Sequence, residues 1–143
     1  MVRVDNCEIV ENSLGRWNPA DLAYVEKICL ESWQDSSTSL LIIVGIMMNG
    51  DVKSAKKGWP SKDIPSFRVE LHFHGVRDLL VKAGGSVPIQ LMGFYIEDIA
   101  DRQLENCRYK VGDDENGSIG FYCEDVSVRS IAPISQSSRS KLS

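Results

Sequence analysis

Sequence motifs that accompany catalysis or metal binding are missing from this chain of 143 residues. It contains four cysteines, but no two of them form the C-x-x-C pair of a zinc ribbon or a thioredoxin-like site. The G-x-S-x-G turn that presents a nucleophilic serine is absent, and so is the phosphate-binding G-x-x-x-x-G-K-S/T loop. The sequence therefore predicts no catalytic residues and no cofactor.

Long apolar runs and strong charge are absent as well. The longest apolar run, residues 40–48, is far shorter than the about 20 residues of a membrane-spanning helix. Residues 1–10 lack the apolar core of a signal peptide, so we expect a cytoplasmic protein with reduced thiols. The net charge of −4 is mildly acidic, whereas proteins that bind nucleic acids usually carry a basic face. We therefore expect no membrane and no nucleic acid among its partners.

Strict alternation of apolar and polar residues is the clearest pattern that the sequence does contain. It runs from Phe67 to Phe73, with an apolar residue at every second position. This period is typical of a β-strand that is buried on one face. Gly75 is expected to lead into a further strand over residues 76–82, as a hairpin or as a bulged continuation.

Further segments also have the composition of strands: residues 25–33, 40–48, 89–96, 107–111, 119–123 and 126–131. The first two are expected to pair as a hairpin. Residues 89–96 are almost continuously apolar, which favours a strand covered on both faces. The Asn116–Gly117 pair favours a hairpin turn before residues 119–123. The prediction is seven or eight mostly antiparallel strands in a β-sandwich or a strongly curved sheet, with little helix.

Chain length indicates one β-rich domain over residues 1–134, followed by a disordered serine-rich tail over residues 135–143. Asn18–Pro19 is a possible start of a short helix, because proline is tolerated at the first helical position. Whether residues 18–24 form a helix or a loop stays open. Residues 49–65 are expected to form a long polar connection, and connections of that length are often functional.

Glu70, His72 and His74 are the sharpest candidate for a metal site. Their spacing of two places all three side chains on one face of the predicted strand. Imidazole and carboxylate groups are common zinc ligands. A solvent-exposed sheet face without metal is the alternative interpretation, and the positive charge of Arg68 on the same face favours it.

Trp59, together with Lys56 and Lys57, is the candidate for a partner-binding site. A tryptophan on an exposed loop is a frequent hot spot in protein interfaces. The alternatives are that Trp59 folds back to cover the core and that the lysines form a solvated loop. Trp17 is expected to pack at the edge of the core. Cys107 and Cys123 fall on apolar phases, away from the histidines, so no Cys–His catalytic pair is expected.

Two stretches resemble a known family. The sequence L-G-R-W-N-P over residues 14–19, followed by A-Y-V over residues 23–25, is similar to the opening of the bacterial immunity protein 50 family. Residues 67–79 are similar to that family's L-x-F-x-x-V-x-x-L signature. Where the family pattern has a His–Asp pair before the first strand, this chain has Asp21–Leu22. The resemblance implies a small cytoplasmic β-rich protein that neutralises a cognate toxin by binding it.

These observations leave three hypotheses. The first is a non-enzymatic protein-binding domain that neutralises a toxin, and its acidic bias would suit a basic toxin. The second is a small-molecule or metal-binding β domain that uses the face of Glu70, His72 and His74. The third is a structural module in which exposed sheet edges pair between copies to form a homo-oligomer.

Overall fold

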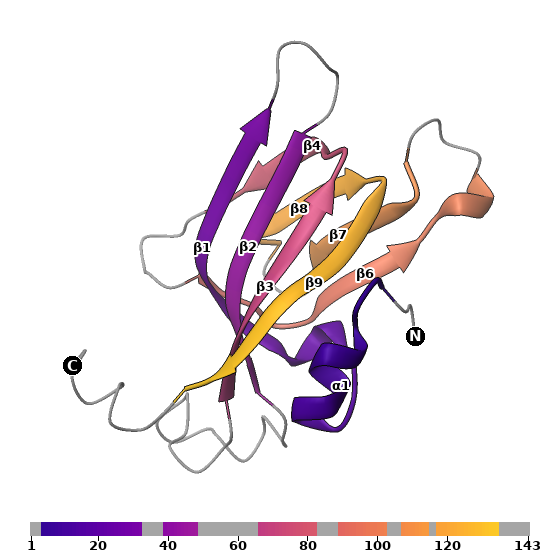
Figure 1. Cartoon of the computed structure of the whole chain (residues 1–143). Helices are drawn as coiled ribbons and strands as arrows, with labels where there is room; N and C mark the ends of the chain where they lie inside the picture. The colour runs from indigo at the N-terminus through magenta and orange to yellow at the C-terminus, as the bar shows by residue number, and fades with distance from the viewer. Residues whose placement is uncertain are drawn as a thin grey trace.

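The computed structural model describes residues 4–32, 39–48, 66–82, 89–102, 107–114 and 117–134. Within these residues the strands form two antiparallel sheets, one of five strands and one of four. The two sheets lie face to face, which makes the fold a β-sandwich (Figure 1). The predicted fold class, mostly β with little helix, is confirmed. The predicted tail over residues 135–143 and the predicted connection over residues 49–65 lie outside the described residues.

The five-stranded sheet has the order β5-β1-β2-β3-β9. Its strands are β1 (Leu22–Ser32), β2 (Ser39–Met48), β3 (Ser66–His74), β5 (Ile89–Gln90) and β9 (Asp125–Pro133). The four-stranded sheet has the order β4-β8-β7-β6 and consists of β4 (Arg77–Val81), β6 (Phe94–Asp98), β7 (Tyr109–Asp113) and β8 (Ile119–Cys123). The described helical segments are α1 (Glu8–Leu14), η1 (Pro19–Asp21) and η3 (Ala100–Arg102).

The alternating strand that the sequence predicts is β3. Its inward residues Val69, Leu71 and Phe73 are at most 1% exposed, whereas Arg68 and His74 on the opposite face are exposed. Such a strand cannot be stable alone in water, because its apolar face must be covered. Burial of that face against the second sheet stabilises the fold by about 25 cal/mol for each Å² of apolar surface removed from water.

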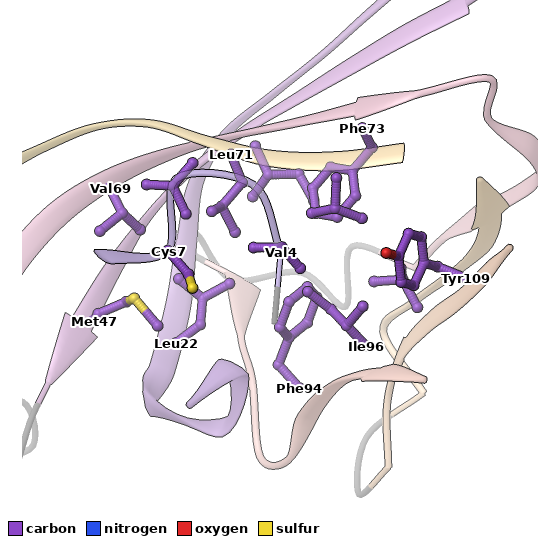
Figure 2. Close-up of a cluster of buried hydrophobic side chains, with 14 of the residues drawn as sticks. Val4, Cys7, Leu22, Met47, Val69, Leu71, Phe73, Phe94, Ile96 and Tyr109 are labelled. Carbon is purple, nitrogen blue, oxygen red and sulfur yellow. The ribbon is translucent and has the colours of Figure 1, made fainter. Parts of the chain in front are cut away.

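The core between the sheets is one contiguous cluster of buried side chains. Figure 2 shows residues of β3 on one side of this cluster and Phe94 and Ile96 of β6 on the other, with Val4 between them. Farther along β3, the ring of Phe73 meets Phe121 of β8 edge to face, with centroids 4.9 Å apart and planes at 84°. The edge-to-face arrangement places the positive edge of one ring against the negative face of the other.

The predicted hairpin of residues 25–33 and 40–48 is confirmed as β1 and β2, which pair antiparallel up to Ser32 and Ser39. β1 begins earlier than predicted, at Leu22. The pairing register shifts beside Tyr24 and again beside Val25. Irregularities of this kind bend a strand and increase its twist.

The prediction that residues 76–82 continue or fold back on β3 is wrong. Gly75 has a φ of 68°, and its N–H donates to the carbonyl oxygen of Ser39 at 2.8 Å. Beyond Gly75 the chain crosses to the other sheet, where β4 pairs with β8. Glycine at this turn is consistent with either path, so the local pattern does not distinguish a hairpin from a crossover between sheets.

The prediction of one continuous strand over residues 89–96 is also wrong. The segment divides into β5 and β6, which belong to different sheets. Gly93 lies between them with a φ of 118°, a conformation that side chains other than hydrogen disfavour. Leu91 is buried at this corner, and its N–H donates to Ala23 O at 2.8 Å. The apolar composition therefore marks a corner within the core, and β6 is an edge strand of its sheet.

Helix α1 is absent from the sequence-based prediction. Cys7, Val10 and Leu14 recur at helical spacing and are at most 3% exposed, but the helix has only seven residues. A periodic pattern is difficult to recognise over so short a window. The helix ends at Gly15, which has a φ of 84° and donates its N–H to Glu11 O. No helix among the described residues is long and apolar enough to cross a membrane.

Gly45→Ala is expected to lower the free energy of unfolding by about 1–3 kcal/mol through overpacking. A Cβ at this position would lie 2.7 Å from Tyr24 O and 2.8 Å from Leu22 Cδ1. The matched control is Gly120→Ala, because a Cβ there would meet no atom closer than Val111 O at 4.0 Å. Urea unfolding followed by circular dichroism measures both variants. Equal losses of stability would contradict the close approach at Gly45.

Burial raises the pKa of the Cys123 thiol to about 12, because the core disfavours the charged thiolate. The folded state thus retains a proton that the unfolded chain releases near pH 9.0, so this contribution to stability is complete below that pH and is lost as the pH rises to about 12. Iodoacetamide labelling with peptide mapping should leave Cys123 unmodified until urea unfolds the protein. Rapid labelling of Cys123 in the native protein would contradict this placement.

Candidate partner-binding surfaces

The outer face of the five-stranded sheet carries the residues of the predicted metal site. Glu70, His72 and His74 alternate with the core residues of β3, so all three project away from the four-stranded sheet. Glu70 Oε2 lies 2.6 Å from His72 Nε2. His74 lies at the end of β3, where its register partner on β9 is Asp125. The spacing thus predicted the shared face but not the direct contact between Glu70 and His72.

Within the segments that the structure describes, no three His, Cys, Asp or Glu side chains lie close enough together to hold a metal ion. Metal binding by Glu70, His72 and His74 stays a prediction, which metal analysis of the purified protein addresses. The other predicted site residues, Lys56, Lys57 and Trp59, lie outside the described residues. Their role as a partner-binding site also stays a prediction.

A salt bridge spans β2 on the same outer face. The Arg68 guanidinium donates to Glu26 on β1 through Nε at 2.6 Å and through a terminal nitrogen at 3.2 Å. The hydrogen bond to Glu26 raises the pKa of Arg68. Both side chains are well exposed, at 45% and 32%, so the pair stabilises the fold by at most about 1 kcal/mol. Because these charges pair within the sheet, less of their field is available to attract a partner.

Cys29, to which the sequence pattern assigns no face, also lies on this outer surface. It is the register partner of Ile42 on β2, and Ile42 is in turn the partner of His72. Neighbouring strands are about 4.8 Å apart, so the two backbones lie about 10 Å from each other with Ile42 between them. Cys123 and Cys7 are buried. Cys123 therefore lies in the core, away from the histidines, as predicted. Cys29 lies on the same outer face as His72, and the prediction did not address it.

A second surface is a groove of about 620 Å³ between η1 and β6. This volume lies within the range of about 300–1,000 Å³ that is common for binding pockets. The residues that line it are Asn18, Pro19, Ala20, Gly93, Phe94, Tyr95, Ile96, Glu97, Asp98 and Asp114. These residues come from three separate parts of the chain, so no local sequence pattern marks the groove.

The η1 wall of the groove is built by the L-G-R-W-N-P stretch that carries the family resemblance. Asn18 Oδ1 accepts a hydrogen bond from Ala20 N–H at 3.1 Å and caps the short 3-10 helix, and Pro19 follows at its first position. Trp17 is 4% exposed and anchors the stretch in the core, as predicted. The open question about residues 18–24 is thus resolved as η1 followed directly by β1.

Asp21, the last residue of η1, forms a bidentate salt bridge with Arg16. The guanidinium donates to the two carboxylate oxygens of Asp21 at 2.7 Å and 3.0 Å. Asp21 is 5% exposed, whereas the side chain of Arg16 is 51% exposed, so a buried carboxylate is paired with a guanidinium at the surface. The hydrogen bond from Arg16 to Asp21 also raises the pKa of the guanidinium. Asp21 stands where the family resemblance had led us to expect a His–Asp pair, and here it orients η1.

The beginning of β6 is held by a second buried carboxylate. Asp113 is 5% exposed, and its Oδ1 accepts the N–H of Met92 at 3.0 Å while its Oδ2 accepts the hydroxyl of Ser118 at 2.9 Å. Asp113 thereby joins the β7–β8 connection to the corner that precedes β6. The neighbouring Asp114 is exposed and donates its N–H to Gly93 O at 3.1 Å.

Asp113→Ala is expected to reduce the free energy of unfolding by about 2–4 kcal/mol, because it leaves two donors without their charged acceptor. Asp114→Ala is the matched control, since it removes an exposed carboxylate and should change stability by no more than about 0.5 kcal/mol. Urea unfolding provides the free energies, and hydrogen exchange at Met92 reports the local bond. Unchanged exchange at Met92 in Asp113→Ala would show that this bond does not order the corner.

Comparison with known proteins gives one result. No curated protein and no solved structure matches the chain. The profile of the family described as Immunity protein PIM8 matches residues 12–129, which include the η1 corner and all of β1 to β8. The predicted resemblance to immunity proteins is confirmed for the class, and membership of the immunity protein 50 family in particular is not confirmed. The chain belongs to the Immunity protein PIM8 family.

Proposed function

We propose that this chain neutralises a cognate protein toxin by binding it, without catalysing a reaction. The observation that supports the proposal is the family match over residues 12–129. An immunity protein has to mask or distort the active surface of its toxin, and tight association is sufficient for that purpose. Such a protein needs a shaped surface rather than a reactive side chain.

The described fold suits a binding role. Its surfaces are carried by two sheets that share one buried core, so they are preformed before a partner arrives. A preformed surface loses less conformational entropy on binding than a flexible one. The net charge of −4 would accelerate encounter with a basic toxin. All four cysteines are free thiols, which is consistent with action in the reducing cytoplasm.

The decisive measurement is the stoichiometry of protection. Each candidate toxin domain encoded by a neighbouring gene is titrated with the purified protein, and residual toxin activity is measured. We expect activity to fall linearly and to reach its minimum at one equivalent, because a binding inhibitor is consumed as it acts. Full inactivation by a small fraction of an equivalent would show turnover and contradict the non-enzymatic proposal.

A second arm tests whether the toxin is the partner at all. The same toxin domain, inactivated at its catalytic site, is titrated with the protein by isothermal titration calorimetry, and growth is measured in cells that co-express the protein with the active toxin domain. Binding together with rescue of growth supports the proposal. Absence of both, with the protein shown by circular dichroism to be folded, would contradict it.

A further inference from the structure

β6 forms one edge of the four-stranded sheet, with β7 as its neighbour in that sheet (Figure 1). Its pairing with β7 is regular over all five residues. Two backbone hydrogen bonds outside the strand fix its orientation. Asp114 donates its N–H to Gly93 O at 3.1 Å, and Ile99 donates its N–H to Arg108 O at 2.7 Å. Gly93 and Ile99 therefore direct their backbone groups toward the β7 side.

Between Gly93 and Ile99, the backbone N–H and C=O groups of successive residues point alternately toward β7 and away from it. In an antiparallel ladder, residues that bond to the neighbouring strand alternate with residues whose N–H and C=O groups point away from it. Tyr95 and Glu97 share the direction of Gly93 and Ile99, so Phe94, Ile96 and Asp98 direct their backbone groups to the open edge. Within the described part of the chain, no residue forms a backbone hydrogen bond with these three edge positions.

The open edge of β6 borders the groove described above. The charged residues that line the groove are Glu97, Asp98 and Asp114, and all three are carboxylates. The opposite wall consists of Asn18, Pro19 and Ala20, of which Pro19 and Ala20 are apolar. The open edge of β6 offers free backbone donors and acceptors, and the groove beside it has an acidic side and a side with apolar residues. Together these features are complementary to an extended peptide strand.

We propose that β6 pairs with an extended strand of the toxin, which adds to the four-stranded sheet as a further strand and presents basic side chains to Glu97 and Asp114. This inference rests on the proposed toxin-binding function and names the surface that performs it. Successive side chains of a strand point to opposite faces, so the added strand meets two environments. Small or apolar side chains face Pro19 and Ala20, and alternate basic side chains face Glu97.

Two of the other sheet edges, β4 and β9, are less suited to this pairing. β4 has a register shift between Arg77 and Leu80, and Asp78 within it has a φ of 56°. Such irregularities are a common protection against unwanted pairing of edge strands. The edge of β9 is partly occupied, because Asp5 forms a parallel bridge with Ser127. β6 therefore combines a regular ladder with an adjoining groove.

A second copy of this chain is a poor occupant of the same edge. Pairing of two β6 strands would bring the carboxylates of Glu97 and Asp98 from both copies together. Like charges across a strand pair destabilise it. Arg102 lies 3.1 Å from Glu97 and Arg108 lies 3.7 Å from Asp98, but these side chains are about half exposed, so both pairs are weak and the carboxylates stay accessible to a basic partner strand. A basic partner strand satisfies the groove, whereas a second acidic edge does not.

Amide hydrogen exchange of the wild-type protein, free and in complex with the inactivated toxin domain that it binds, tests the pairing directly. The amides of alternate edge positions Phe94, Ile96 and Asp98 should exchange at least ~10-fold more slowly in the complex. Tyr95 and Glu97 should be protected in both states, because they already bond to β7. Unchanged exchange at the three edge positions in a complex that does form would overturn the proposal.

Two variant pairs supply the matching affinity test. Ile96→Pro replaces the isoleucine side chain and also removes the backbone N–H that points to the open edge. Ile96→Ala shortens the same side chain but keeps that N–H. We expect Ile96→Pro to weaken binding at least ~10-fold more than Ile96→Ala, because a carbonyl of the toxin strand loses its donor. Glu97→Lys should weaken binding by ~10-fold, whereas the charge reversal Glu31→Lys on β1 should not.

The outcomes separate this inference from the function on which it rests. If the wild-type protein fails to bind the toxin domain, the proposed function is wrong. If the wild-type protein binds and the β6 variants bind equally well, the proposed function stands and the assignment to β6 is wrong. Weaker binding of Glu31→Lys than of Glu97→Lys would place the interface on the five-stranded sheet instead. If Ile96→Pro does not fold, the exchange measurement on the wild-type complex still decides.

Discussion

Packing of one sheet against the other, as in the contact between Phe73 and Phe121, is the constraint on which the rest of this structure depends. Neither sheet can exist alone in water with an apolar face exposed. Each strand must therefore direct every second side chain into the shared core. This requirement determines which residues remain outside, and thus which surfaces are available to a partner. Glu70 and His72 lie on the outer face because Val69, Leu71 and Phe73 are needed inside.

The same constraint explains why the chain changes sheets where it does. Gly75 and Gly93 both adopt positive φ values, and each lies at a point where the chain leaves one sheet for the other. Glycine permits such corners because it has no Cβ. The second corner converts an apolar segment into the edge strand β6. The open edge of β6 beside the groove therefore results from the crossover at Gly93 and not from a local sequence motif.

Two buried carboxylates, Asp21 and Asp113, hold the walls of the groove in place. The Arg16–Asp21 pair orients η1, and Asp113 ties Met92 to Ser118 in front of β6. Buried carboxylates of this kind are stable only while their hydrogen bonds are complete. The family resemblance in residues 14–19 therefore has a structural explanation. These residues turn the chain from α1 into β1 and at the same time form one wall of the groove.

Sequence alone determined the period of the strands and therefore the fold class. Alternation from Phe67 to Phe73 requires one buried face, and spacing of two requires that Glu70, His72 and His74 share the other. These are local properties of a pleated backbone. Only the tertiary structure decided that β4 and β6 belong to the second sheet, that Glu70 contacts His72, and that η1 lies beside the edge of β6. Each of these depends on which distant strands pair, and alternating patterns do not specify a partner, since every strand in a sandwich presents the same apolar face to the core.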